Sequence, residues 1–281
     1  MMPSGKARLA GVIGWPVGHS LSPRVHGYWL REHGIDGAYV ALAVSPGEVA
    51  AALAGLRVLG FAGANVTVPH KEAAMEAVDS CDDTARRIGA VNTLIVKPDG
   101  SITGTSTDGF GFCENLVGAI PNWAPTGPAV VLGAGGAARA IAFALTDAGV
   151  PEIRIVNRTH WRGEELASAV GKDASFVAWD SRSGALDGAK LLVNATSLGM
   201  NSVPPLSLSL DVLPTDAVVA DVVYAPLETP LLGEARARGN SCVDGLGMLL
   251  HQARPGFAAW FGLEPKVTPE LRAFVLGRGE E

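Results

Sequence analysis

The sequence predicts a two-domain α/β protein, with an N-terminal open α/β domain and a C-terminal Rossmann-like domain. The chain has 281 residues, which is enough for two domains of ordinary size. Short apolar runs alternate with segments of helical spacing before residue 97, and the alternation begins again at residue 129. A glycine-rich turn follows the first strand of the second series, which is the place where a Rossmann fold holds a dinucleotide.

The first series predicts the N-terminal sheet. Residues 9–13, 38–44, 61–66 and 93–96 form short apolar runs typical of strands. Residues 23–33, 47–59 and 71–78 lie between them and have the spacing of helices. Repeated strand and helix units favour an open α/β sheet, which we assign to substrate binding because the dinucleotide motif lies elsewhere.

The second series predicts the C-terminal sheet, with strands near residues 130–132, 153–156, 191–194 and 218–223. A loop rich in proline, residues 121–128, precedes it. The apolar spacing after Asp244-Gly245 predicts a terminal helix that packs back on the first domain.

The motif G-x-G-x-x-A is the strongest local signal. It reads Gly133-Ala134-Gly135-Gly136-Ala137-Ala138 and lies between an apolar strand and the helical stretch at residues 137–148. Glycines at such a turn let the backbone approach a pyrophosphate at the N-terminus of a helix. This context predicts a bound dinucleotide.

The second strand of this domain indicates which dinucleotide binds. NAD-binding versions carry an acidic residue about 20 positions beyond the glycines, where it accepts hydrogen bonds from the ribose 2′-hydroxyl. This chain instead has Asn157-Arg158-Thr159, with Arg162 one helical turn later. A planar guanidinium suits a phosphate dianion, so NADP is favoured over NAD. The alternative is that both arginines are solvated surface charges.

We therefore expect two domains. Residues 1–108 and 245–281 form the substrate-binding and catalytic domain, and residues 109–244 form the NADP-binding domain.

Composition excludes several other classes of protein. The net charge of −6, with no basic block, argues against nucleic acid as a partner. The three cysteines have neither zinc nor disulfide spacing, which favours the reducing cytoplasm. No apolar run reaches the roughly 18 residues of a membrane span. His19, His26 and His70 lack acidic or cysteine partners at ligand spacing, so we expect no metal.

Two ionisable residues in the first half are candidates for chemistry. Lys71 ends the stretch Asn65-Val66-Thr67-Val68-Pro69-His70-Lys71, and Asp108 lies in Thr105-Ser106-Thr107-Asp108-Gly109. Reducing a ketone needs a hydride from a nicotinamide and a proton for the oxygen, and a lysine can supply the proton. Desolvation would lower the pKa of the lysine and a nearby carboxylate would raise it, so the sequence leaves the balance open. Both residues are also ordinary surface charges.

Several ordered motifs carry a resemblance to the shikimate/quinate dehydrogenase family over nearly the whole chain. They are Gly14-Trp15-Pro16-Val17-Gly18-His19-Ser20-Leu21-Ser22-Pro23, the Asn65 to Lys71 stretch, Gly89-Ala90-Val91-Asn92-Thr93, Ser106-Thr107-Asp108-Gly109, Asn194-Ala195-Thr196-Ser197-Leu198-Gly199-Met200, Asp221-Val222-Val223-Tyr224-Ala225-Pro226 and Gly247-Met248-Leu249-Leu250-His251-Gln252.

The resemblance implies roles for individual residues. Lys71 and Asp108 would be the catalytic pair, and Ser20 and Ser22 would bind a substrate carboxylate, with Tyr224 near it. The residues that would contact the ring hydroxyls of the substrate are Thr67, Lys71, Asn92, Asp108 and Gln252. Those that would bind the cofactor are Gly133, Ala134, Gly135, Gly136, Ala137, Asn157, Arg158, Thr159, Arg162, Thr196, Gly245 and Met248, the last near the nicotinamide.

Each assignment has a structural alternative. Ser20 and Ser22 could cap the helix that starts near Pro23, and Gln252 could face water. Asn92 could fasten a turn, Tyr224 could be a core residue, and Asn194 and Thr196 could only shape a loop beside the cofactor.

The resemblance implies an NADP-dependent reduction of 3-dehydroshikimate to shikimate in aromatic biosynthesis, by a monomer or homodimer. The alternatives are a quinate or aminoshikimate-type dehydrogenase and a non-catalytic sensor of dinucleotides or metabolites. Ser22 and Thr67 favour shikimate over quinate. Ser106 and Gly27 depart from the family pattern, which has asparagine at both places.

Overall fold

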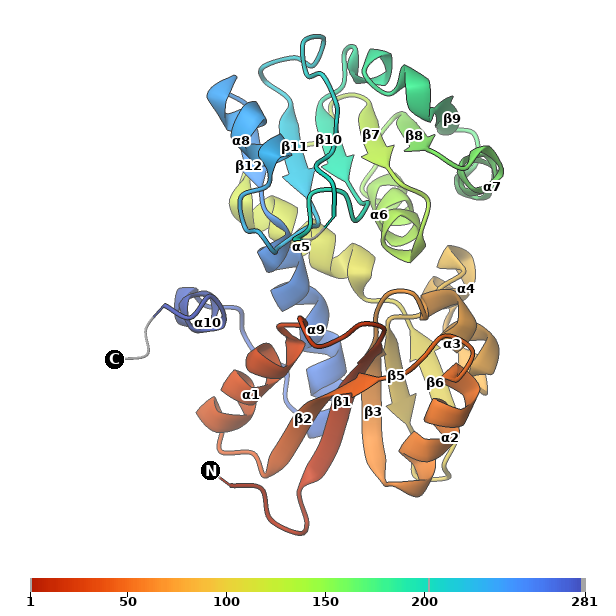
Figure 1. Cartoon of the computed structure of the whole chain (residues 1–281), viewed down its shortest axis with the longest axis vertical. Helices are drawn as coiled ribbons and strands as arrows, with labels where there is room; N and C mark the ends of the chain where they lie inside the picture. The colour runs from red at the N-terminus through yellow and green to blue at the C-terminus, as the bar shows by residue number, and fades with distance from the viewer. Residues whose placement is uncertain (1, 202, 279–281) are drawn as a thin grey trace. The chain divides into compact units, whose positions relative to one another are not determined.

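The computed structural model describes residues 2–201 and 203–278 (Figure 1). The chain divides into two compact units. Residues up to Thr107 and those from Leu249 onward form the first unit, and Asp108–Met248 form the second. The sequence placed the two junctions after residues 108 and 244. The predicted roles of the two units, substrate binding for the first and cofactor binding for the second, stay predictions.

The first unit is built on a six-stranded mixed sheet in the order β2-β1-β3-β5-β6-β4. Its strands are β1 (Arg8–Gly14), β2 (Gly37–Ala43), β3 (Phe61–Val66), β4 (Ser80–Cys81), β5 (Thr93–Val96) and β6 (Ile102–Thr105). Strand β5 runs antiparallel to both β3 and β6. It therefore begins at the sheet edge where the parallel strands β1 and β3 end, so residues 92 and 93 lie at the same edge as residues 14 and 66.

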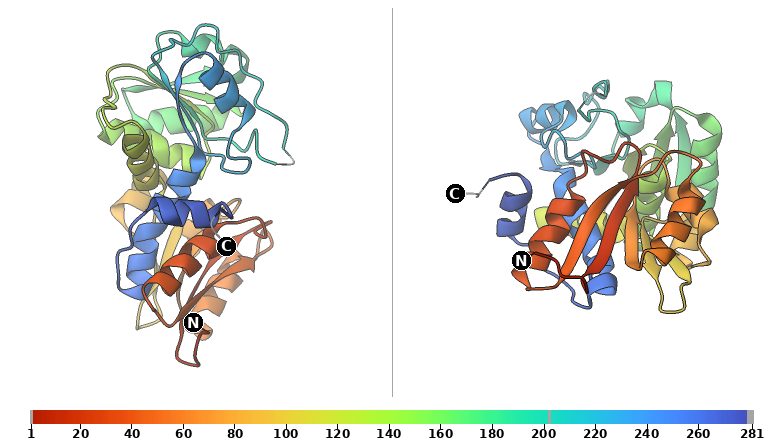
Figure 2. Two further views of the ribbon diagram at one scale, coloured as in Figure 1. Left: turned by 90° about the vertical axis from the view of Figure 1, so that its left-hand side faces the viewer. Right: turned by 60° about the horizontal axis from the view of Figure 1, so that its bottom comes forward.

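The helices of the first unit flank this sheet. They are α1 (Ser22–Glu32), α2 (Val49–Val58), α3 (Lys71–Ala77), α4 (Asp83–Ile88) and α10 (Pro269–Val275), together with the part of α9 (Gly245–Phe261) that follows Met248. Helix α10 lies beside α1, as Figure 2 shows, and a guanidinium nitrogen of Arg24 donates to the carbonyl of Phe274 at 2.8 Å.

Helix α9 supplies aromatic side chains to the core of the first unit. Trp260 is buried, and its Nε1 donates to the carbonyl of Leu94 at 2.9 Å. This contact requires a glycine at position 63, because a Cβ there would lie 2.0 Å from the Leu94 oxygen and 2.2 Å from Trp260 Nε1. The backbone of Gly63 also has a φ of +157°, a conformation that L side chains rarely adopt.

The same core holds a histidine. His26 on α1 is fully buried, and its ring stacks on that of Tyr39 with 3.9 Å between centroids and 4° between planes. Trp29, Phe257 and Trp260 surround the pair.

The second unit contains a six-stranded sheet that is parallel throughout, in the order β12-β11-β10-β7-β8-β9. Its strands are β7 (Ala129–Leu132), β8 (Ile153–Asn157), β9 (Ala174–Ala178), β10 (Leu191–Asn194), β11 (Val218–Asp221) and β12 (Ser241–Val243). Its helices are α5 (Asp108–Ala119), α6 (Gly136–Asp147), α7 (His160–Val170) and α8 (Pro230–Ala237). The strand order reverses between β7 and β10, which is the Rossmann arrangement and confirms the predicted fold class.

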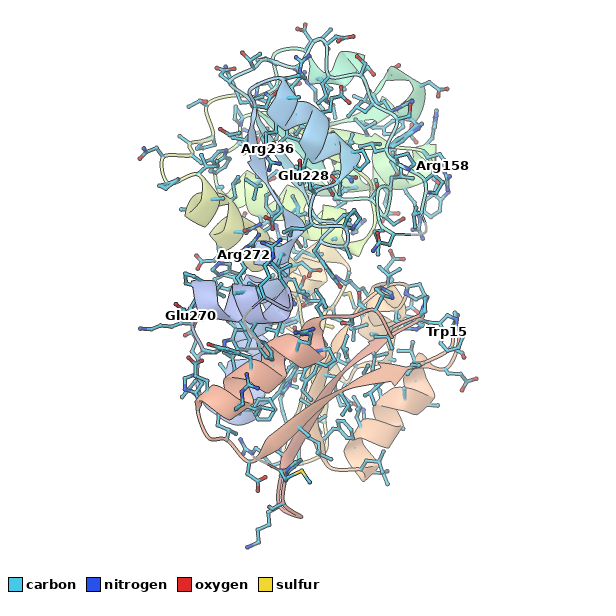
Figure 3. The ribbon with its side chains drawn as sticks, turned by 60° about the vertical axis from the view of Figure 1, so that its left-hand side comes forward. Trp15, Arg158, Glu228, Arg236, Glu270 and Arg272 are labelled. Atoms are coloured by element: carbon cyan, nitrogen blue, oxygen red, sulfur yellow. The ribbon has the colours of Figure 1, made fainter. Side chains whose placement is uncertain are left out.

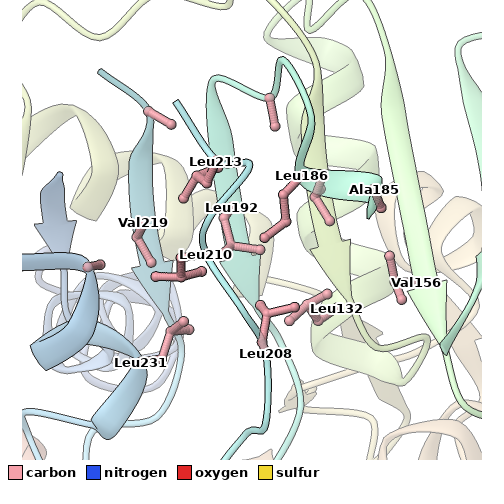
Figure 4. Close-up of a cluster of buried hydrophobic side chains, with 14 of the residues drawn as sticks. Leu132, Val156, Ala185, Leu186, Leu192, Leu208, Leu210, Leu213, Val219 and Leu231 are labelled. Carbon is pink, nitrogen blue, oxygen red and sulfur yellow. The ribbon is translucent and has the colours of Figure 1, made fainter. Parts of the chain in front are cut away.

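Apolar side chains from strands and loops fill one side of this sheet (Figure 4). Leu132, Leu192 and Val219 project from β7, β10 and β11, and Leu208 and Leu210 cover them from the long connection after β10. All five are buried. The burial of these side chains holds the strands of the sheet together, and the loops of the site emerge from the ends of those strands.

Candidate functional site

The serines of the first motif follow strand β1. Ser22 is the first residue of α1 and is 5 % exposed, and its backbone N–H donates to Ser20 Oγ at 3.3 Å. The N-cap residue of α1 is Leu21, and no side chain makes the capping hydrogen bond. Neither serine is the N-cap residue, but Ser20 Oγ accepts from the first N–H of the helix, so binding of a substrate carboxylate by these serines stays a prediction.

The loop after β3 carries Thr67 and Lys71. The N–H of Thr67 donates to the carbonyl of Ile13 at 2.8 Å, and a Cβ at Gly14 would meet the Thr67 methyl at 2.5 Å. Glycine at position 14 thus lets Thr67 pack against the end of β1. His70 Nε2 lies 2.7 Å from the carbonyl oxygen of Val44, and Lys71, half-buried, begins α3.

A buried polar network joins the neighbouring strands. Asn92 is 2 % exposed, and its Oδ1 accepts from the backbone N–H of Thr107 at 2.8 Å. Its Nδ2 donates to the side-chain oxygen of Gln252 at 3.1 Å. The Thr107 hydroxyl donates to the carbonyl of Gln252 at 2.8 Å, and Gln252 Nε2 donates to the carbonyl of Leu249 at 3.0 Å. Gln252 is 8 % exposed, so the alternative that it faces water is wrong.

Residues that the sequence did not assign to the site complete this network. The Tyr39 hydroxyl donates to Asn65 Oδ1 at 2.6 Å, and the Asn65 amide donates to the Thr93 hydroxyl at 3.1 Å. Burial raises the pKa of Tyr39 well above its ordinary value, and a hydrogen bond with Ser22 partly opposes the shift. Because β5 is antiparallel, Asn65 and Thr93 lie opposite each other in register, a pairing that the spacing of the residues does not reveal.

Asp108 opens helix α5 and belongs to the second unit, directly after Thr107. It is 5 % exposed. A carboxylate in the first turn of a helix is stabilised by the helix dipole. A Cβ at the next residue, Gly109, would lie 2.8 Å from the carbonyl of Ala140, so this glycine permits close packing of α5 on α6.

The glycine motif forms the turn between β7 and α6. Gly133 has a φ of +111°, and its N–H donates to the carbonyl of Val156 at 2.8 Å. A Cβ there would lie 3.1 Å from the carbonyl of Ala195. Gly135 is the N-cap of α6, and a Cβ at this position would meet open space. Ala134 is buried in the turn, and the chain continues through Gly136 and Ala137 into a helix of 12 residues. Open space at the start of a helix fits an approaching pyrophosphate.

Arg158 directly follows β8 (Figure 3), and Arg162 lies in the first turn of α7. Arg158 is exposed and makes no ion pair with any described residue. Asn157 Nδ2 donates to the carbonyl of Thr159 at 2.9 Å, which tightens the turn into α7. The guanidinium carbon of Arg162 lies 5.2 Å from the centre of the exposed Trp161 ring. The exposed Arg158 guanidinium is accessible to an anionic ligand.

The loop after β10 is held by side chains. Asn194, fully buried, accepts from the backbone N–H and the hydroxyl of Thr196 at 3.1 and 2.7 Å. Its Nδ2 donates to the carboxylate of Asp221 at 2.9 Å. Asp221 is the first residue of the motif Asp221 to Pro226, but the sequence analysis did not assign it to the site.

The last predicted residues are Tyr224, which follows the end of β11, and Gly245 and Met248, which lie in the first turn of α9. Tyr224 is half-buried and Met248 is 7 % exposed. A Cβ at Gly245 would lie 2.3 Å from the carbonyl of Val222, so only glycine fits here.

Within the described ranges, no group of three or more histidine, cysteine and acidic residues is placed to hold a metal ion. No helix among the described residues has the length and apolar character needed to cross a membrane.

Comparisons with known proteins show which proteins the chain resembles. Residues 12–94 match the model described as "Shikimate dehydrogenase substrate binding domain", and residues 124–203 match "Shikimate / quinate 5-dehydrogenase". A protein of Paramagnetospirillum magneticum named shikimate dehydrogenase (NADP(+)) is 60% identical over 97% of this chain and 99% of its own length.

Two solved structures are also similar over nearly the whole chain. A shikimate dehydrogenase in complex with NADP+ has a TM-score of 0.90 and 36% identity, covering 98% of this chain and 97% of the other. The enzyme of Thermus thermophilus in complex with NADP(H) and shikimate has a TM-score of 0.83 and 38% identity, covering 96% and 97%.

Proposed function

The chain belongs to the shikimate dehydrogenase family, and we propose that it catalyses the reversible, NADP-dependent reduction of 3-dehydroshikimate to shikimate. This reaction is a step of chorismate and aromatic amino-acid biosynthesis. The observation that carries the proposal is the 60% identity, over nearly the whole of both chains, to a relative named for this activity. Identity at this level extends over the residues of both units.

The polar edge of the first unit is suited to a polyhydroxylated acid. Ser20 and Ser22 offer hydroxyl donors to the substrate carboxylate, so that no permanent countercharge is buried beside it. Thr67, Asn92 and Gln252 present hydroxyl and amide groups to the ring hydroxyls. A site built from such groups rejects analogues that lack the matching hydroxyl, because its own buried donors and acceptors are then left unpaired.

The reaction needs a proton at the substrate oxygen as well as a hydride. NADPH, when bound, supplies the hydride. Lys71 donates the proton to the carbonyl oxygen during reduction and removes it from the hydroxyl during oxidation. We assign to Asp108 the role of orienting Lys71 and the substrate during the reaction. Tyr224 contacts the carboxylate, and Met248 packs against the nicotinamide.

The second unit has the groups that NADP requires. The turn from Gly133 to Ala137 receives the pyrophosphate, and the open space at Gly135 supports this assignment. Asn157, Arg158, Thr159 and Arg162 form the 2′-phosphate site, with Thr196 and Gly245 beside the rest of the cofactor. The exposed Arg158 has no ion-pair partner among the described residues, so phosphate binding breaks no existing pair.

A quinate dehydrogenase is the second candidate, because the matched family description names both substrates. Ser22 and Thr67 favour shikimate, and comparison of turnover on shikimate, quinate and aminoshikimate separates the candidates. The cytoplasmic location and the monomeric or homodimeric state also stay predictions.

The test is turnover by the purified protein with NADP and shikimate, followed at about 340 nm, where NADPH absorbs. We expect Lys71→Ala to lower kcat by about 10³-fold while the Kd for NADPH changes by less than about twofold, because the proton donor acts only in the transition state. Lys97→Ala is the matched control, since Lys97 is an exposed lysine in the turn between β5 and β6. Wild-type protein that binds both ligands without any absorbance change would exclude the proposed reaction.

A further inference from the structure

Asp221 is a buried carboxylate with no role in the mechanism above. It ends strand β11 and is 2 % exposed. Its Oδ1 accepts from Asn194 Nδ2 at 2.9 Å and from the backbone N–H of Val223 at 3.0 Å. Its Oδ2 accepts from the hydroxyl of Thr229 at 2.7 Å. All three donors are neutral, and burial raises the pKa of this carboxyl above its ordinary value.

These hydrogen bonds reach two loops at the carboxyl end of the sheet. Asn194 holds the loop after β10, because its Oδ1 accepts from both polar groups of Thr196 and its Nδ2 also donates to the carbonyl of Leu198 at 3.1 Å. The Thr196 hydroxyl in turn accepts from the N–H of Leu198 at 3.1 Å. Every donor and acceptor of the Asn194 amide thus has a defined partner.

The loop after β11 is fixed by the other two donors. Val223 directly precedes Tyr224, and Thr229 is the N-cap of α8, where its hydroxyl accepts from the N–H of Leu232 at 3.3 Å. The two loops also meet directly, since the N–H of Asn201 donates to the carbonyl of Ala225 at 2.9 Å. The carboxylate of Asp221 therefore bonds to Asn194, just before the first loop, and to both ends of the second loop.

The orientation of the Asn194 amide depends on this carboxylate. Asp221 offers only an acceptor, so the NH₂ group of Asn194 must face it and the amide oxygen must face Thr196. Without Asp221, the NH₂ group loses one of its two acceptors, and the amide can turn over. The hydroxyl and N–H of Thr196 would then face a donor.

We propose that Asp221 is a positioning residue of the dehydrogenase, which locks the Thr196 loop and the Tyr224 loop into the arrangement that receives the nicotinamide half of NADP. This inference rests on the proposed function, because Thr196 and Tyr224 are its cofactor and substrate contacts. Asp221 acts through Asn194 and Thr229 and does not itself touch either ligand.

The variants Asp221→Ala and Asp221→Asn test the proposal. Asp221→Ala removes all three acceptor contacts, and we expect KM for NADP to rise about tenfold and kcat to fall about tenfold, since misplacement by about 1 Å can cost up to about 100-fold. KM for shikimate should rise less than KM for NADP, because the loop after β11 carries one assigned substrate contact, Tyr224, whereas the hydroxyl and amide groups assigned to the ring lie in the first unit. Asp221→Asn keeps Oδ1 and loses only the acceptor for Thr229, so its kinetic constants stay within about threefold of wild type.

Asn240→Ala is the matched control for a loss of stability alone. Asn240 is also a buried polar residue of the second unit, and its amide donates to the carbonyls of Pro214 and Ala217 at 2.8 and 2.9 Å. These two residues lie at the far end of the β10–β11 connection, next to β11 and well separated in sequence from residues 195–199. We expect it to lower the melting temperature as Asp221→Ala does while KM for NADP stays unchanged. A KM for NADP that is unchanged in Asp221→Ala overturns the proposal.

Hydrogen exchange separates this proposal from the assignment of function. In the ligand-free protein, Asp221→Ala should speed amide exchange of residues 195–199 by at least about tenfold, whereas Asn240→Ala should not. This measurement needs no activity, so it holds even if the wild-type enzyme does not oxidise shikimate. Equal exchange of the loop in wild type and Asp221→Ala overturns the positioning role.

Discussion

His26 should make the stability of the protein depend on pH in a way that one substitution abolishes. Its ring is fully buried, and in the described part of the chain neither nitrogen has a hydrogen-bond partner. Burial lowers the pKa of His26 from 6.5 to about 3. Asn65 lies near the ring and partly opposes the shift, but its amide is not aligned for a hydrogen bond with either nitrogen.

The sign and size of this pH dependence of stability follow from proton linkage. In the unfolded chain His26 binds a proton below about pH 6.5, whereas in the folded protein it stays neutral down to about pH 3. Acidification therefore favours the unfolded state: stability is fully present above pH 6.5 and is lost as the pH falls. At about 1.4 kcal/mol per pKa unit, the loss is ~2 kcal/mol at pH 5 and approaches ~5 kcal/mol near pH 3.

Urea unfolding at several pH values between about 7.5 and 5 measures this effect. His26→Phe keeps a flat ring against Tyr39 but cannot bind a proton, so its free energy of unfolding should fall by ~2 kcal/mol less than that of wild type over this range. His19→Asn, which removes an exposed histidine, should follow wild type. Parallel pH dependence in wild type and His26→Phe would refute the reasoning.

Two further substitutions test the cofactor assignment and the packing of the first core. Arg158→Asp should lower kcat/KM for NADP by about 100-fold and shift the preference toward NAD, because a carboxylate repels the 2′-phosphate; an unchanged ratio of kcat/KM for the two cofactors would contradict the assignment. Gly63→Ala should lower the free energy of unfolding, measured in urea, by at least ~3 kcal/mol, because its Cβ would lie 2.0 Å from a backbone oxygen. The control is Gly60→Ala, at a positive φ with open space around it, which should lower the free energy of unfolding by only ~1 kcal/mol. Equal losses in the two variants would show that steric overlap is not the cause.

Much of the fold follows from the sequence. The runs at residues 61–66, 93–96 and 191–194 coincide with β3, β5 and β10, because each is a short apolar strand bounded by turn residues. The prediction for residues 218–223 was too long. The strand ends at Asp221, whose side chain takes the N–H of Val223 out of the sheet.

The missed elements are the short or weakly apolar ones. Strands β4 and β12 have two and three residues, too few for a period to be visible, and β6 (ITGT) and β9 (ASFVA) contain few large apolar residues. The antiparallel direction of β5 was also not predicted. Pro98-Asp99-Gly100 between β5 and β6 is a typical turn and was the available signal.

The site was predicted as a set of residues but not as a network. Ser22, Asn92 and Gln252 were named from motifs, and the structure shows them buried. Tyr39 and Asp221 were not assigned, since a tyrosine in an apolar strand and an acid at a strand end have many ordinary explanations. Their importance comes from partners distant in sequence, which only the sheet registers bring together.

The first unit is discontinuous, and this has a consequence for synthesis on the ribosome. Asp108–Met248 is an unbroken stretch, so the second unit can complete its core once the ribosome has passed residue 248. Trp260 and Phe257, which close the core around His26, are translated later. Until α9 emerges from the ribosome, the N-terminal sheet lacks these two aromatic side chains, so the first unit completes its core last.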